Sequence, residues 1–146
     1  MKKILFVCHG NICRSPMAEF LMKDMAEKEG LDVYVESAAT STEEIGNGVH
    51  YGTKRKLAEY GISCEGKRAR QMTKRDYDEF DYIIGMDDWN IRNINRIIGS
   101  DPQHKVYKLL DFADGGDIAD PWYTHNFDET YDDIIRGLNG LIDELR

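Results

Sequence analysis

The sequence predicts an α/β domain in which helices cover both faces of a parallel sheet. Short apolar segments alternate along the chain with longer segments whose apolar residues have helical spacing, and this alternation is typical of parallel sheets. The first segment, Ile4-Leu5-Phe6-Val7, is apolar at every position, as a strand covered on both faces would be. A chain of 146 residues is long enough for a full hydrophobic core, so we expect one domain over residues 1–146.

The first half of the chain is expected to supply two strands and two helices. Residues 2–7 are almost wholly apolar and predict the first strand. Residues 16–29 carry an apolar stripe at helical spacing and are followed directly by a glycine, a common helix stop. Residues 33–37 predict the second strand, and residues 50–60 a second helix. The connection at 38–48 is long and rich in turn formers, so we expect it to line a site.

The second half continues the alternation. Residues 73–80 predict a short helix, and residues 81–86 a third strand. Isoleucines at helical spacing predict a helix over 89–98, which a glycine follows. Residues 105–109 predict the fourth strand, and a long apolar face predicts a final helix over 127–146. No repeat, low-complexity segment or linker interrupts this order.

Helix starts have recognisable residues. Ser15 is a good cap for the first helix, and Pro16 suits its first turn. Thr73 can cap the short helix, and Asp87 or Asp88 can cap the helix over 89–98.

Charge and cysteine content restrict the partners and the compartment. The net charge of −8 and the pI of about 5.0 argue against nucleic acid or an anionic membrane as a partner. No apolar run approaches the roughly 20 residues of a membrane span. The N-terminus resembles a signal peptide only superficially, because its apolar core is too short and no cleavage site follows. Three cysteines without framework spacing fit a reducing, cytoplasmic compartment. We also expect the protein to be a monomer.

The segment after the first strand predicts an anion site with a thiol. Cys8 ends the strand, five residues follow, and then come Arg14 and the start of a helix. Backbone N–H groups and the positive end of a helix dipole would converge on one point there. In parallel sheets, ligands bind at this carboxyl edge of the strands.

The residue types in this loop suit a phosphate ester. Gly10 lets the backbone approach closely, and the planar fork of Arg14 matches two phosphate oxygens. Ser15 is placed to donate to the Cys8 sulfur when that sulfur becomes a leaving group, and the Asn11 amide can hold the loop. We expect Cys8 to be the nucleophile and the phosphate-binding segment to be His9, Gly10, Asn11, Ile12, Cys13, Arg14 and Ser15.

Such a nucleophile needs a proton donor for the departing oxygen. Asp120 stands out among the acidic residues because Pro121 follows it and biases it to an extended conformation. The next two residues, Trp122 and Tyr123, could form a wall against which an aryl ring packs. We therefore expect Asp120 to be the general acid and the two aromatic residues to line the substrate pocket.

With these residues in place, the chain resembles the low-molecular-weight protein tyrosine phosphatases. The matched features are the Cys8-x5-Arg14-Ser15 loop with its proline, the Asp120-Pro121 pair with two aromatic residues after it, and the stretches Ser37-Ala38-Ala39-Thr40 and Ala69-Arg70-Gln71. Their order and spacing agree over essentially the whole chain. The resemblance implies a four-stranded parallel sheet flanked by helices, a three-layer sandwich with flavodoxin-like or Rossmann-like topology.

The resemblance also implies a two-step hydrolysis of phosphotyrosine in a protein substrate. Cys8 would attack phosphorus while Asp120 protonates the departing tyrosyl oxygen, and Asp120 would then activate the water that hydrolyses the phosphocysteine. Arg14 would hold the phosphate oxygens, with no metal and no cofactor. For Cys13 two readings stay open: inert packing, or a reversible disulfide with Cys8 as the family uses it.

The sequence departs from the family pattern at three places. At one of them, Trp122 stands where tyrosine is commoner. The family often carries a histidine before the Ala-Arg-Gln stretch that supports the loop asparagine, but the residues here are Gly66-Lys67-Arg68, so what holds Asn11 is open. The family's loop after the second strand often supplies an aromatic pocket wall. Here that loop contains Thr42-Glu43-Glu44, which leaves a different substrate preference open.

Three other functions share parts of this sequence pattern. An arsenate reductase with a similar loop needs further cysteines to relay a disulfide, whereas Cys64 has no partner after it. Protein arginine phosphatases with a similar loop typically carry threonine where Ile12 stands, and an apolar residue there favours an aryl ring over a guanidinium. A non-catalytic phosphate-binding module predicts the loss of Cys8, Arg14 or Asp120, and all three are present.

Overall fold

A four-stranded, all-parallel sheet forms the centre of the structure, a computed structural model that describes all 146 residues. The strand order is β2-β1-β3-β4. This arrangement confirms the predicted parallel sheet and the number of strands. The strands are β1 (Lys2–Cys8), β2 (Val33–Ala39), β3 (Tyr82–Gly85) and β4 (Val106–Lys108).

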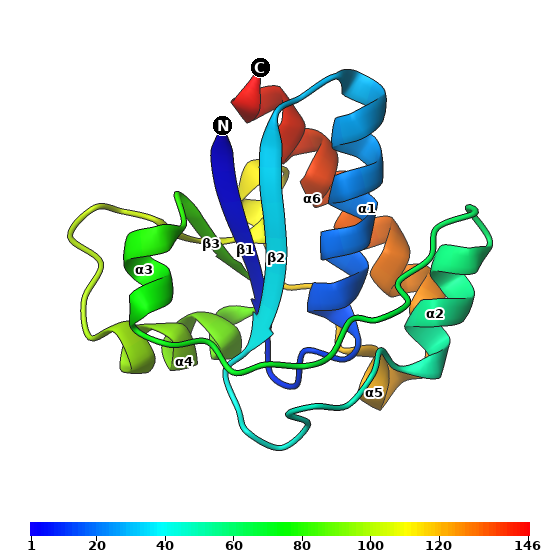
Figure 1. The fold of residues 1–146 in the computed structure, drawn as a ribbon, viewed down its shortest axis with the longest axis horizontal. Coiled ribbons are helices and arrows are strands. Elements are labelled where there is room, and N and C mark those ends of the chain that lie inside the picture. Colours follow the sequence, from blue (N-terminus) through cyan, green and yellow to red (C-terminus); the bar gives the residue numbers. More distant parts are fainter.

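Helices cover both faces of this sheet and complete the predicted three layers (Figure 1). On one face lie α1 (Arg14–Glu29), α2 (Tyr51–Ala58) and α6 (Phe127–Leu145). On the other face lie α3 (Arg75–Glu79) and α4 (Asp88–Ile98). None of the helices combines the length and the apolar character that crossing a bilayer requires.

The central strand β1 divides its side chains between two hydrophobic clusters. Ile4, Phe6 and Cys8 pack with residues of α1 and α6, whereas Leu5 and Val7 pack with residues of α3 and α4. This division follows from the alternation of side chains along a strand. All of these β1 residues are buried. Burial on both faces fixes the position of Cys8 at the carboxyl end of the strand.

The start of α1 differs from the prediction. The helix begins at Arg14, and the residue before it makes no side-chain cap. Ser15 is therefore not the cap, and Pro16 follows it within the first turn. Ser15 does not cap the helix because its hydroxyl contacts the Cys8 sulfur instead of a free backbone N–H group.

Capping in the second half of the chain is predicted correctly for one helix and wrongly for another. Asp87 caps α4, as its carboxylate accepts from the backbone N–H of Asn90 at 2.7 Å. Thr73 does not cap α3, which starts after Lys74. Instead the backbone N–H of Thr73 donates to the Asp76 carboxylate at 2.8 Å.

Two short helical turns were not predicted: the 3-10 turn η1 (Leu109–Phe112) and α5 (Pro121–Thr124). The α5 turn, the loop after β1 and the loop after β2 all lie at the carboxyl end of β1, at the bottom of Figure 1. Both chain termini lie at the opposite end of the sheet.

Candidate active site

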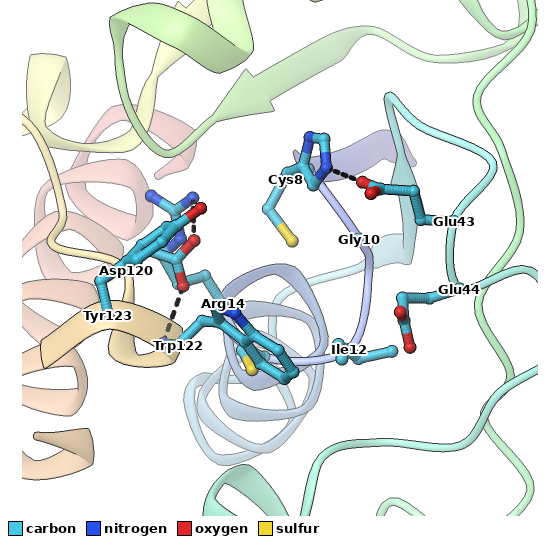
Figure 2. A pocket seen from close by; sticks show the side chains of 11 residues that line it. Cys8, Gly10, Ile12, Arg14, Glu43, Glu44, Asp120, Trp122 and Tyr123 are labelled. Carbon is cyan, nitrogen blue, oxygen red and sulfur yellow. Dashed lines mark hydrogen bonds and ion pairs between the residues drawn. The ribbon is translucent and has the colours of Figure 1, made fainter. Parts of the chain in front are cut away.

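A pocket opens at the carboxyl end of β1, where the sequence predicted one. The loop of residues 8–14 forms its floor, with the Cys8 sulfur facing the opening (Figure 2). Glu43 and Glu44, from the loop after β2, line one side. Asp120 lines the other side together with Trp122 and Tyr123 of α5. The structure thus brings the predicted nucleophile, arginine, acid and aromatic wall into one pocket.

Two hydrogen-bonding groups contact the Cys8 sulfur. The backbone N–H of Asn11 donates to Sγ at 3.3 Å, and the Ser15 hydroxyl lies 3.0 Å from it. Only 3% of Cys8 is exposed. Both groups would contact a thiolate at this position, and the thiolate is the nucleophilic form of a cysteine.

Asn11 is held by its own side chain in a backbone conformation that few residues adopt. Its φ of 58° lies in the left-handed region, where asparagine is among the less disfavoured residues. Its amide nitrogen donates to the hydroxyls of Ser15 at 2.8 Å and Ser37 at 2.9 Å, and its amide oxygen accepts from the backbone N–H of Arg70 at 3.3 Å. Ser37 and Arg70 are therefore the supports of Asn11 that the sequence left open.

Arg14 is buried and tied to two carboxylates. Its Nη1 donates to Asp87 and to the Ile118 carbonyl, both at 2.8 Å, and its Nη2 donates to Asp120 at 3.4 Å. Burial by itself would lower the pKa of Arg14, but the negative charges of Cys8, Asp120 and Asp87 outweigh burial and raise it. The guanidinium therefore remains charged, and the Nε–H and one Nη2–H are left for another acceptor.

Asp120 has the extended backbone that its following proline predicted, with φ of −83° and ψ of 115°. One carboxylate oxygen accepts from the backbone N–H of Trp122 at 3.0 Å and caps α5. The other faces Arg14, and the side chain remains one quarter exposed. A carboxyl group held in this way can exchange protons with solvent and with a bound molecule.

The pocket entrance has an aromatic side and an acidic side. Trp122 and Tyr123 are 56% and 79% exposed, so their rings are available to a ligand. Across from them, the Glu43 carboxylate contacts Nε2 of His9 (Figure 2). Glu44 lies so close to Gly10 that a Cβ there would be 3.3 Å from its Cγ.

The two remaining cysteines are buried free thiols in different places. Burial, with the negative charges of Cys8 and Asp120, raises the pKa of Cys13 to about 12. Cys13 is thus a neutral thiol in the pocket wall near neutral pH. Burial also raises the pKa of Cys64, which lies in a separate cavity bordered by α2.

Asp87 is a site residue whose role was not predicted from the sequence. It was expected only as a helix cap, but the same carboxylate also fixes Arg14. A signal was available, because Asp87 comes two residues after β3, and β3 pairs with β1 in parallel. The carboxyl ends of neighbouring parallel strands meet at one edge of the sheet.

Comparison with known proteins agrees with this geometry. Residues 3–146 match the family described as low molecular weight phosphotyrosine protein phosphatase. The low molecular weight protein-tyrosine-phosphatase YfkJ of Bacillus subtilis is 42% identical, over 100% of this chain and 97% of its own. Its crystal structure superposes with a TM-score of 0.95, covering 99% of this chain and 94% of that one.

Two further solved structures are similar. The low molecular weight protein tyrosine phosphatase SP-PTP of Streptococcus pyogenes is 43% identical with a TM-score of 0.90, covering 100% of this chain and 94% of its own. The Drosophila arginine phosphatase DARP is 28% identical with a TM-score of 0.89, covering 99% and 97%. By sequence over its whole length and by fold, the chain belongs to the family of low-molecular-weight protein-tyrosine-phosphatases, which are cysteine-dependent phosphatases.

Proposed function

We propose that the protein hydrolyses phosphotyrosine in protein substrates, and small aryl phosphates, through a phosphocysteine on Cys8. The observation that carries this proposal is the convergence of Cys8, Arg14 and Asp120 in one pocket beside exposed aromatic rings. The catalytic and phosphate-binding roles of individual residues are part of this proposal. No metal or cofactor takes part in it.

In the first step, the Cys8 thiolate attacks phosphorus and the bond to the tyrosyl oxygen breaks. Asp120 donates its proton to that oxygen, so the leaving group departs as a neutral phenol. Arg14 and the backbone N–H groups of residues 9–15 bind the three equatorial oxygens, where negative charge is spread in the transition state. The Asp87 contact keeps the guanidinium in place during this step.

In the second step, Asp120 is a carboxylate and takes a proton from water. The water oxygen forms a bond to phosphorus, the S–P bond breaks, and inorganic phosphate is released. The Ser15 hydroxyl, 3.0 Å from the sulfur, stabilises the thiolate as it leaves. The enzyme returns to its starting state with Cys8 ionised and Asp120 protonated.

Two of the alternatives receive no support from the geometry. Cys64 lies outside the pocket, so it is not placed to relay a disulfide as an arsenate reductase requires. A non-catalytic phosphate-binding module does not require an acid facing the thiol, yet Asp120 lines the same pocket as Cys8.

Phosphoarginine is the harder alternative, because the Drosophila arginine phosphatase shares this fold. Ile12 lines the pocket and presents an apolar surface beside the floor, which suits an aryl ring better than a charged guanidinium. We expect kcat/KM to be higher for a phosphotyrosine peptide than for the matched phosphoarginine peptide, and Ile12→Thr to reduce that ratio by about tenfold. Faster phosphate release from phosphoarginine by the unaltered protein would reverse the assignment.

The acidic side of the entrance predicts the sequence around the phosphotyrosine. Glu43 and Glu44 border the opening, and Glu43 also contacts the His9 ring. We expect peptides with lysine or arginine next to phosphotyrosine to have about fivefold higher kcat/KM than peptides with glutamate there, an effect of the size of one or two exposed ion pairs. The preference should shrink as salt is added.

The test of this preference is Glu43→Gln with Glu44→Gln, compared with Glu65→Gln, which removes one exposed charge away from the pocket. The double variant is expected to lose the preference, whereas the Glu65 variant should keep it. An unchanged preference in the double variant would show that these carboxylates do not determine which residues are favoured next to phosphotyrosine.

Cys13 is proposed to protect the nucleophile. Peroxide would convert the Cys8 thiolate to a sulfenic acid, and the Cys13 thiol would condense with it, forming the disulfide and releasing water. We expect mass spectrometry after mild peroxide treatment to find the Cys8–Cys13 disulfide, and reductant to restore activity. Cys13→Ser should make inactivation irreversible, and Cys64→Ser should not. Full recovery of the Cys13 variant would contradict this role.

A further inference from the structure

A buried ion pair lies behind the loop that holds Cys8. Glu19 of α1 is 4% exposed, and its Oε1 is 3.4 Å from the ammonium of Lys67. The Lys67 side chain is 13% exposed and also donates to the backbone carbonyl of Ser37 at 2.8 Å. A second lysine, Lys23, contacts the other carboxylate oxygen of Glu19 at 2.6 Å, but its side chain is 46% exposed. Lys67 is thus the less exposed of the two counter-ions of Glu19.

We propose that Lys67 is a positioning residue that sets the direction of a hydrogen-bond chain ending at the Cys8 sulfur. The chain runs from Lys67 through Glu19, Ser37, Asn11 and Ser15. This inference rests on the proposed role of Cys8 as the nucleophile. Lys67 occupies the place before Ala69-Arg70-Gln71 where the family often carries a histidine. Unlike an imidazole, an ammonium cannot accept a hydrogen bond, so it can act in one direction only.

In the first half of the hydrogen-bond chain, the charge of Glu19 determines which group donates. An ionised carboxylate has no hydrogen to donate, so Glu19 can only accept the hydroxyl hydrogen of Ser37. The Ser37 oxygen is then free to accept, and it does so from the amide nitrogen of Asn11. Lys67 contacts the same carboxylate oxygen, Oε1, that accepts from Ser37, whereas Lys23 contacts the other oxygen. The Lys67 ammonium therefore holds Oε1 in place as the acceptor for Ser37.

The second half follows from the orientation of the Asn11 amide. Its nitrogen donates to the oxygens of both Ser37 and Ser15, so the Ser15 hydrogen is left for the Cys8 sulfur. If the amide were reversed, its oxygen would face the two hydroxyls and compete with the sulfur for the Ser15 hydrogen. The backbone N–H of Arg70 opposes this reversal from the other side, because it requires the amide oxygen. Glu19 with Lys67 and the Arg70 backbone therefore fix one orientation together.

The test removes the Lys67 charge and measures how the alkylation of Cys8 depends on pH, which requires no turnover. Lys67→Met should raise the pH midpoint for alkylation of Cys8 by iodoacetamide by about one unit, followed on the Cys8 peptide by mass spectrometry, because a donor to an anion is weakened. For aryl phosphate hydrolysis we expect kcat to fall about tenfold and KM to change much less, since the phosphate contacts remain. Lys67→Arg should restore most of both values.

A matched control and a double-mutant cycle isolate the path. Lys54→Met removes an exposed charge from the same cavity border, makes no contact with Glu19, and should leave the midpoint unchanged. In a Ser37→Ala background the hydrogen-bond chain is already interrupted. Lys67→Met should therefore shift the pH midpoint of alkylation little further. A shift of undiminished size in that background would mean that Lys67 acts through its charge directly, and would overturn the proposal.

An unchanged midpoint in folded Lys67→Met would also overturn it, with folding checked by thermal unfolding. If the methionine variant does not fold, Lys67→Gln removes the same charge and keeps a donor for the Ser37 carbonyl, and the same outcomes apply. Because alkylation needs no turnover, these results remain interpretable even if the unaltered protein fails to hydrolyse aryl phosphates. That failure would count against the proposed function alone.

Discussion

Replacing Cys8 by serine is expected to lower the hydrolysis of aryl phosphates by more than about 10⁴-fold, the order lost when other covalent enzymes lose their nucleophile. A serine hydroxyl is not ionised near neutral pH, and Asp120, which is protonated when it acts as the acid of the first step, cannot take its proton. The backbone N–H groups and Arg14 remain, so binding of phosphate should persist. The expected result is therefore a separation of turnover from binding.

Tryptophan fluorescence can measure the binding half of this result. The chain contains two tryptophans, and Trp122 lines the pocket, so a Trp89→Phe background leaves a single reporter at the site. In that background Cys8→Ser should bind inorganic phosphate with a dissociation constant close to that of the parent. Cys64→Ser, a thiol removed outside the pocket, should keep full activity. Appreciable turnover by the Cys8 variant would falsify the proposed nucleophile.

Replacing Asp120 by asparagine is expected to slow phosphotyrosine hydrolysis by about 10²- to 10⁴-fold, the usual contribution of a general acid. Asparagine keeps an oxygen that can accept from the Trp122 backbone and cap α5, so the pocket should retain its shape. The first-step loss should be much smaller for p-nitrophenyl phosphate, whose leaving group departs without protonation. Single-turnover release of the two phenols measures this difference.

The matched control is Asp114→Asn, in the loop between η1 and α5 that also contains Asp120. The Asp114 carboxylate is paired with Arg136 at 2.9 Å, away from the pocket. This variant should hydrolyse both substrates at rates close to those of the parent. If Asp120→Asn slowed the release of both phenols equally, Asp120 would be acting on binding or structure rather than as a proton donor.

The residues closest to the chemistry could be predicted because local rules determine them. An apolar strand, a five-residue spacing and an arginine at a helix start place Cys8 and Arg14, and a proline after Asp120 gives it the observed extended backbone. Local rules failed where a side chain had a stronger partner elsewhere. Ser15 has the composition of a cap but contacts the Cys8 sulfur instead.

Contacts between distant segments could not be predicted from the sequence. Asp87 contacts Arg14 although 73 positions separate them in the sequence. β3 lies beside β1, so the residues that follow β3 reach the same edge of the sheet as the loop after β1. Glu19 meets Lys67 because α1 packs near the segment that leads into the Arg70 contact with Asn11. In the sequence both acids look like ordinary members of a set of 27 acidic residues. Only the packing of elements identifies their partners.

The measurement that most directly tests the central claim is capture of the phosphoryl group on Cys8. The Asp120→Asn variant lacks the base for the second step, so it should accumulate the phosphocysteine when mixed with p-nitrophenyl phosphate and quenched in acid. Mass spectrometry of the digest should find a phosphoryl adduct on the peptide that contains Cys8, with none when Cys8→Ser is added. An adduct on another residue, or nitrophenol released with no adduct at any quench time, would contradict hydrolysis through Cys8.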